Sequence, residues 1–293
     1  MTSLPKPRIF VYEDMIVATA VECLKMTEAK YTILRHTGIQ TALGEILIIR
    51  ITSSGFVLVG GPSVVTQMEM IISILKSMNA AKILIDGAFS RKTVSKSTDA
   101  CIFAVGAAYS YDMAKVVEAA KLSLYQFSLP IIPDKFRYLD GVEQIALIDK
   151  IDHYTTLPYS SVIQFHNEVV NLLSEDIEYL YLPGSFPSSF LKELLTNRKL
   201  QQLKIIIKSP THMVLTESML KHLQYSKIKV SVINPINLVS IMYNPFSPNG
   251  HYFDDDIFNK ELSKITSLPL INVMNERRND DNDEKIKFES NSD

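Results

Sequence analysis

CIFAVGAA, residues 101–108, is an apolar run, and a helical pattern over Ser110–Tyr125 follows it directly. A short apolar run of this kind is typical of a buried strand. The inward face of the helix is formed by Met113, Val116, Val117, Ala120 and Leu124. A strand that leads into a helix is the repeating unit of α/β proteins, so the sequence predicts a mainly parallel sheet covered by helices.

The residues before this stretch extend the same interpretation toward the N-terminus. Lys82–Asp86 (KILID) is predicted to be a second buried strand, and a helix from Ser63, its expected N-cap, to Met78 precedes it. Glu45–Ile51 and Gly55–Gly60 are β-rich and are expected to form an antiparallel hairpin. A strand over Arg8–Tyr12 and a helix over Asp14–Met26 complete this half.

The residues after Pro130 alternate between strand and helix patterns again. Strands are predicted at Ile177–Leu182, Lys204–Lys208, Ile228–Ile233, Leu238–Tyr243 and Leu270–Val273, and helices at Ser161–Leu173, Pro187–Thr196, Thr216–Gln224 and Asp254–Lys264. Pro130–Lys135 interrupts the pattern and is the expected boundary. The predicted organisation is an α/β domain at 1–132, a second, smaller α/β domain at 133–274, and a disordered polar tail at 275–293.

Composition limits the function classes. The chain has 293 residues, and 46% of them are hydrophobic, as expected of a globular protein. Its net charge of −2 gives no electrostatic reason to expect binding of nucleic acid or anionic lipid. Its two cysteines, Cys23 and Cys101, form no metal-binding motif, and its six histidines are isolated from one another. The N-terminus has no apolar signal segment. We therefore expect a cytoplasmic protein with no metal site, no nucleic-acid partner and no membrane partner.

Asp86 and Gly87 end the predicted strand Lys82–Asp86 in the manner of the acidic strand of phosphate-binding-loop nucleotide hydrolases, whose carboxylate holds Mg²⁺. The alternative is a structural turn. The partner motif, Gly-x-x-x-x-Gly-Lys-Ser/Thr, does not occur in the sequence. Gly61 and Ser63 open a helix and could bind an anion through backbone amides, or form a tight turn. We expect no intrinsic cofactor, and weak or absent binding of Mg-ATP.

Two loops are candidates for contacts with a ligand or a partner. The first contains Arg91, Lys92 and Asp99 between two predicted strands, and its alternative role is that of a solvated loop. The second, NPFSPNG at residues 244–250, is fixed by two prolines and contains Asn244 and an aromatic side chain, Phe246. It is either a partner-contact loop or a connector. The sequence shows no set of residues that would support catalysis by the chain alone.

Several of these motifs resemble a known family. KPRIFVY at residues 6–12, TGIQTALG at 37–44, IDGAFSRK at 85–92, TDACIFAVGAA at 98–108 and the NPFSP motif at 244–248 are similar to the small, ATPase-like reactivase subunit of lysine 5,6-aminomutase and to proteins associated with ornithine aminomutase. The resemblance spans most of the chain before residue 275.

The resemblance implies a chaperone-like role. Such a subunit works with a larger reactivase subunit to exchange damaged cobalamin on an adenosylcobalamin-dependent aminomutase, using ATP, and it could form oligomers. Longer relatives begin with the phosphate-binding loop that this sequence lacks. The resemblance therefore implies that the fold is a remnant of a phosphate-binding-loop fold. The alternatives are a nucleotide-binding ATPase whose loop is missing from this chain, and a non-catalytic structural subunit.

Overall fold

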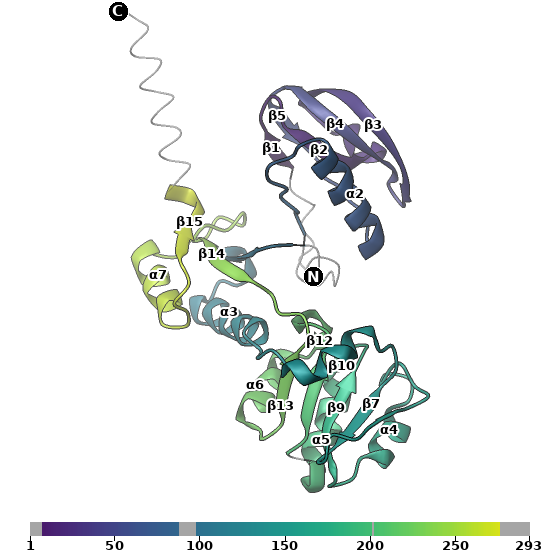
Figure 1. Ribbon diagram of the computed structural model, residues 1–293. Helices are drawn as coiled ribbons and strands as arrows, with labels where there is room; N and C mark the ends of the chain where they lie inside the picture. Colours follow the sequence, from purple (N-terminus) through teal and green to yellow (C-terminus); the bar gives the residue numbers. More distant parts are fainter. Residues whose placement is uncertain (1–7, 88–97, 201, 276–293) are drawn as a thin grey trace, which may run out of the picture. The chain divides into compact units, whose positions relative to one another are not determined.

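The chain has mixed α/β architecture with several sheets, and it divides into two compact units. The computed structural model describes residues 8–87, 98–200 and 202–275 (Figure 1). The units are Met1–Ser97 and Thr98–Asp293. The boundary expected near residue 132 falls inside the second unit, and the predicted tail, apart from residue 275, lies outside the described residues.

The first unit is built on antiparallel strands and one long helix. Its elements are β1 (Ile9–Val11), β2 (Ile16–Ala20), α1 (Val21–Leu24), β3 (Lys30–Thr41), β4 (Gly44–Ser53), β5 (Gly55–Val57) and α2 (Val65–Ser77). One sheet has the order β2-β4-β3 and the other pairs β1 with β5, all antiparallel. The prediction of a mainly parallel sheet is therefore wrong for this unit.

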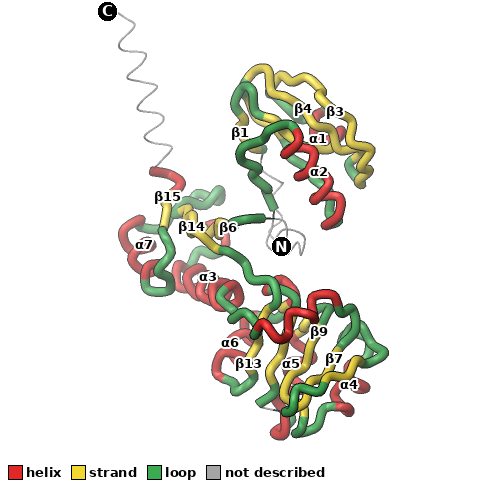
Figure 2. The backbone as a smooth tube through the Cα atoms, in the orientation of Figure 1, coloured by secondary structure: helices red, strands yellow, loops and turns green. Residues whose placement is uncertain are grey.

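The central strand β4 is buried on both faces, which explains its almost uninterrupted apolar sequence. Ile46 and Ile48 pack in one cluster with Ile71 of α2, whereas Ile49 packs in another cluster with Val57 of β5. A helix and a two-stranded ribbon therefore supply the two sides of this small core (Figure 2).

Three sequence-based assignments in this unit are wrong. The helix predicted over Asp14–Met26 is strand β2 followed by the single turn α1. The strands at Glu45–Ile51 and Gly55–Gly60 do not form a hairpin, because β4 pairs with β2 and β3 while β5 pairs with β1. Lys82–Asp86 is not a strand, so the first unit has no acidic strand of the nucleotide-hydrolase type at this position.

The described part of the second unit contains three sheets with parallel pairing, one of them only a short two-stranded pair. β6 (Cys101–Gly106), β14 (Leu238–Asn244) and β15 (Leu270–Asn272) form a parallel sheet of order β15-β14-β6, and α3 (Met113–Phe127) and α7 (Asp255–Ser263) contribute to its core. Cys101–Gly106 thus pairs with a strand from the far end of the chain. This pairing joins residues on both sides of the expected boundary near residue 132.

The larger sheet of this unit has the order β13-β11-β9-β7-β8. Its strands β9, β11 and β13 run parallel to one another, and β7 is antiparallel to both of its neighbours, β9 and β8. The elements in this part are η2 (Asp134–Gly141), β7 (Ala146–Asp149), β8 (Tyr154–Thr156), α4 (His166–Leu172), β9 (Ile177–Leu182), β10 (Phe186–Pro187), α5 (Ser188–Thr196), η3 (Arg198–Leu200), β11 (Lys204–Ile207), η4 (Pro210–His212), β12 (Met213–Val214), α6 (Glu217–Tyr225) and β13 (Lys229–Val232). A short parallel pair of β10 with β12 lies outside this sheet.

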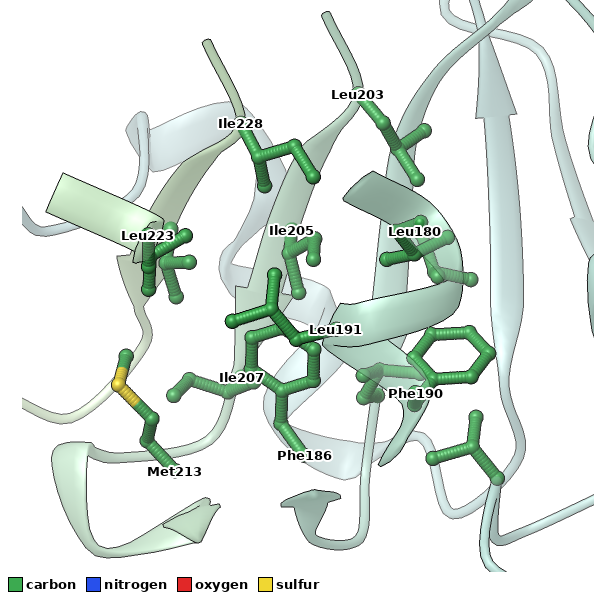
Figure 3. Packing of buried hydrophobic residues seen from close by; sticks show 14 of the residues in the cluster. Leu180, Phe186, Phe190, Leu191, Leu203, Ile205, Ile207, Met213, Leu223 and Ile228 are labelled. Atoms are coloured by element: carbon green, nitrogen blue, oxygen red, sulfur yellow. The ribbon is translucent and has the colours of Figure 1, made fainter. Parts of the chain in front are cut away.

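The core of the larger sheet is formed where α5 packs on it (Figure 3). Leu191 on α5 lies over Ile205 and Ile207 of β11, and Phe190 lies on the side of Leu180 of β9. None of these five side chains is exposed to solvent. Burial of side chains of this size contributes about 1.5–3 kcal/mol each. The apolar run at residues 205–207 of β11 follows from its position inside the sheet, between β9 and β13.

Helix α3 connects the two cores of the second unit. Val116 and Ala120 belong to the core of the three-stranded sheet, whereas Leu122, two residues further on, belongs to the core of the larger sheet. Near the end of the helix, the buried Gln126 side chain donates hydrogen bonds from Nε2 to the backbone oxygens of Pro210 (2.6 Å) and Met213 (3.0 Å).

One prediction concerns a close backbone approach in the first unit. A Cβ at Gly60 would lie 2.6 Å from Sγ of the buried Cys23, whereas a Cβ at Gly61 would meet only Cε of Met68 at 3.7 Å. We expect Gly60→Ala to lower the free energy of unfolding by about 1–3 kcal/mol through overpacking, and Gly61→Ala to change it by much less. Urea denaturation of both variants measures the difference, and equal midpoints would contradict the prediction.

Candidate functional site

The carboxyl edge of the sheet β15-β14-β6 is the candidate functional site. Because the three strands are parallel, they end at the same edge, at Gly106, Asn244 and Asn272. Ligands of open α/β sheets bind beyond this edge, where the loops that leave the strands come together. Here those loops are residues 107–112, which lead into α3, and residues 245–254, which lead into α7.

His251 holds the two loops together. Its Nε2 donates a hydrogen bond to the backbone oxygen of Ala107 at 2.9 Å, and the oxygen of Ser110 lies 3.3 Å away. Because both partners are carbonyl oxygens, Nε2 carries a proton. Nδ1 is buried and has no hydrogen-bond partner in the part of the chain that the structure describes. The imidazole therefore fixes the loops, and its second nitrogen is closed to solvent.

Aromatic side chains cover this edge. The Tyr111 ring stacks on His251 with 4.1 Å between centroids, and the Phe246 ring stacks on Tyr252 with 5.9 Å between centroids. Tyr111 and Tyr252 are 72% and 70% exposed. We call Tyr109, Tyr111, Phe246 and Tyr252, all of them exposed, the carboxyl-edge surface. Rings held by stacking but open to water suit contact with another molecule.

A hydrogen-bonded layer lies beneath these rings. The hydroxyl of Tyr243 donates to Oδ1 of Asp255 at 2.8 Å and accepts from Nδ2 of Asn259 at 3.0 Å. Burial raises the pKa of Tyr243, and the bond to the Asp255 carboxylate raises it further. Asn272, at the end of β15, accepts a bond from the amide of Met274 with its side-chain oxygen. The contacts of Tyr243 tie the end of β14 to α7, and the bond of Asn272 orders the backbone after β15.

Acidic residues occupy the helix N-termini at this edge. Oδ1 of Asp112 accepts from the amide of Ala114 at 2.9 Å, and Oδ1 of Asp254 accepts from the amide of Ile257 at 3.0 Å. Each helix thus fills its own N-terminal amide site with a carboxylate. An incoming phosphate would meet negative charge here, so the edge is unsuited to anions.

A cleft of about 650 Å³ lies beside the carboxyl-edge surface, between the start of α3 and α6. Two interactions cross it: the hydroxyl of Tyr109 donates to Oε1 of Glu217 at 2.6 Å, and Nζ of Lys221 lies 3.0 Å from Oε1 of Glu118. The hydrogen bond to Glu217 raises the pKa of Tyr109. The cleft also contains the exposed Lys115. Lys221 and Glu118 thus pair with each other, and Glu217 pairs with the Tyr109 hydroxyl.

The structure brings two of the sequence-predicted residues to this site. Asn244 ends β14, and its Oδ1 accepts a hydrogen bond from the amide of Phe246 at 2.9 Å, which starts the loop. Asp99 lies at the opposite edge, before β6, where its backbone oxygen accepts from Nδ2 of Asn237. Sequence reasoning missed Tyr111 and His251. Both lie in the loops that follow β6 and β14, and no sequence pattern marks them.

The other predicted residues lie in the first unit. Asp86 and Gly87 are exposed and do not follow a strand. Helix α2 begins at Val65 with Val64 as its N-cap, and no side chain caps it, so the assignment of Ser63 as N-cap is wrong. Gly61 precedes this helix in a half-buried position. Arg91 and Lys92 lie outside the described residues.

Further observations bear on the site. Among the described residues, no group of three or more His, Cys, Asp or Glu side chains could hold a metal ion. None of the helices in residues 8–87, 98–200 and 202–275 is long and apolar enough to cross a membrane. Comparison with protein-family models found no match, and neither did comparison with curated proteins or with solved structures.

Proposed function

We propose that this chain is a binding subunit without its own catalytic activity, and that it acts with a larger reactivase subunit on an adenosylcobalamin-dependent aminomutase. Its role is chaperone-like: the complex exchanges damaged cobalamin for intact cofactor. The observation that carries the binding role is the carboxyl-edge surface, with Tyr111 and Tyr252 exposed and held by stacking. The partner comes from the resemblance of the motifs at residues 85–92, 98–108 and 244–248.

The chemistry of the carboxyl-edge surface supports a protein partner. Tyrosine and phenylalanine are enriched at protein interfaces and provide much of the binding energy there. Stacking fixes the Tyr111 and Tyr252 rings before a partner arrives. The hydrogen bonds of His251 fix the backbone that carries them. A surface ordered in advance loses little entropy on binding.

We propose that the chain has no intrinsic cofactor and binds Mg-ATP weakly or not at all. Two observations support this. Asp112 and Asp254 occupy the helix N-termini at the carboxyl edge, where a phosphate would otherwise bind. Asp86 does not follow a strand, and the sheets of the first unit are antiparallel. The described part of the first unit therefore lacks the parallel sheet and the acidic strand that are typical of phosphate-binding-loop hydrolases.

The test is assembly with the proposed partners. We expect the chain, co-expressed with the aminomutase and the larger subunit, to elute with them in size-exclusion chromatography. The double variant Tyr111→Ser with Tyr252→Ser is expected to weaken the complex at least about tenfold, because exposed aromatic anchors dominate interfaces. Tyr225→Ser is the matched control, since Tyr225 is 88% exposed at the end of α6. Absence of any wild-type complex would contradict the proposed function.

A further inference from the structure

We infer that the carboxyl-edge surface binds a positively charged, arginine-containing segment of its protein partner. The identity of that partner rests on the proposed function, but the chemistry of the surface does not. The inference combines two observations, the exposed aromatic rings and the sign of the charge around them.

The segments that leave β6 and β14 at this edge are negatively charged. Asp112, Asp254, Asp255 and Asp256 all lie in the segments that leave β6 and β14. Neither residues 98–114 nor residues 244–259 contain a lysine or an arginine. The nearest cations in sequence are Lys115, which lines the cleft beside α6, and Lys260, in the last turn of α7. After β15 the sequence continues with Glu276, Arg277 and Arg278, which lie outside the described residues.

These carboxylates can accept further hydrogen bonds from a partner. Asp112 and Asp254 cap their helices through Oδ1, and a carboxylate has a second oxygen that can accept further hydrogen bonds. Asp256 is exposed in the first turn of α7. A carboxylate with a free oxygen favours a guanidinium, which donates several hydrogen bonds in one plane.

The rings favour the same ligand group. A guanidinium stacks on the face of a tyrosine through cation–π attraction and dispersion, and it is more weakly hydrated than a lysine ammonium. Tyr111 and Tyr252 are the two most exposed of the four rings. Tyr111 adjoins Asp112 in sequence, and only Phe253 separates Tyr252 from Asp254. An arginine side chain could therefore meet a ring and a carboxylate together.

Other partners fit the surface less well. A phosphopeptide, a nucleic acid or an anionic membrane would meet like charge at every helix N-terminus of this edge. A purely apolar segment would desolvate the surrounding carboxylates without compensation. The inference therefore commits to a basic peptide segment, and it predicts an association that weakens as salt concentration rises.

The experiment uses the full chain and fluorescently labelled peptides in an anisotropy titration. The probes are oligo-arginine, oligo-lysine, oligo-glutamate and a neutral Gly-Ser peptide of equal length. We expect binding in the order arginine, then lysine, with no binding of the other two. Tyr252→Ser with Asp256→Asn is expected to weaken oligo-arginine binding about tenfold, because it removes one ring and one charge.

The control variant is Tyr225→Ser with Asp176→Asn, which removes one exposed ring and one exposed charge from the other part of the second unit. It should bind oligo-arginine as the wild type does, and circular dichroism shows whether both variants fold. Equal weakening of both variants, no effect of the surface variant, or equal binding of oligo-glutamate would overturn the inference.

The outcomes also separate this inference from the proposed function. Specific oligo-arginine binding without a complex with the aminomutase would refute the proposed function and keep the inference. A complex with the aminomutase that depends on Tyr111 and Tyr252 but not on salt or on Asp256 would support the proposed function and refute the inference. Analytical ultracentrifugation tests whether a second copy of the chain binds this surface. If the wild type is a dimer and the surface variant is a monomer, the surface is a dimer interface and the inference is overturned.

Discussion

Phe190→Ala is expected to lower the free energy of unfolding of the second unit by about 3–5 kcal/mol. Phe190 is completely buried on α5, between the larger sheet and neighbouring aromatic rings. Its ring packs edge-on against Phe186, with 6.3 Å between centroids, and against His166, with 5.2 Å between centroids. Truncation removes this apolar area and leaves a cavity that the strands beneath cannot fill without moving.

The control for this prediction is Phe190→Leu, which keeps most of the volume and should cost less than about 1.5 kcal/mol. Equilibrium unfolding in urea, followed by far-ultraviolet circular dichroism, measures both variants. A loss for Phe190→Ala of under about 1 kcal/mol would show that α5 repacks freely, against the close-packed core in Figure 3.

The parallel strands β9 and β11 of the larger sheet could be predicted well because they are largely buried, whereas β7 and β8 were not predicted. Ile177–Leu182 is strand β9 with the bounds read from the sequence, and Lys204–Lys208 differs from β11 by one residue. Parallel strands under helices have continuous apolar runs, and those runs are the clearest signal that a single sequence offers. The pairing of β6 with β14 could not be read in this way, because more than a hundred residues separate them.

The first unit was harder to predict because its strands have mixed character. β3 (Lys30–Thr41) is largely polar and mostly exposed, since it lies at the edge of its sheet and pairs only with β4. Its sequence has neither a run nor an alternation of apolar residues. In Asp14–Met26, apolar residues near helical spacing suggested a helix, but sheet pairing with β4 decided the structure of Ile16–Ala20.

The candidate site was predictable only in part. Asn244 and Phe246 were identified because a proline-fixed loop after a strand is a recognisable pattern. His251 and Tyr111 had no such pattern, since their meaning depends on the contact between two loops that are far apart in sequence. Isolated histidines were judged only as metal ligands, whereas His251 acts as a hydrogen-bond donor that joins the loops.

The last prediction concerns the contact by which α3 holds the two cores of the second unit together. Gln126 is 8% exposed, and both of its hydrogen bonds are donated to backbone carbonyl oxygens, those of Pro210 and Met213. Gln126→Glu keeps the shape but places a carboxylate opposite two acceptors. We expect a loss of about 3–5 kcal/mol in the free energy of unfolding at neutral pH, because a buried charge without a partner is costly.

This loss should depend on pH in a defined direction. Burial and the facing oxygens favour the protonated acid, so the folded-state pKa of the new glutamate lies above its unfolded value of about 4.3. Between these two values the native state binds more protons than the unfolded state, and stability therefore falls as pH rises. Measured as the difference from wild type at each pH, the loss should shrink as pH approaches about 4. Gln126→Leu is the control: it lacks the hydrogen bonds, costs about 1–3 kcal/mol, and adds no titrating group. A difference for Gln126→Glu that stays constant between neutral and acidic pH would show that the carboxylate reaches water, and that α3 does not hold the two cores through this side chain.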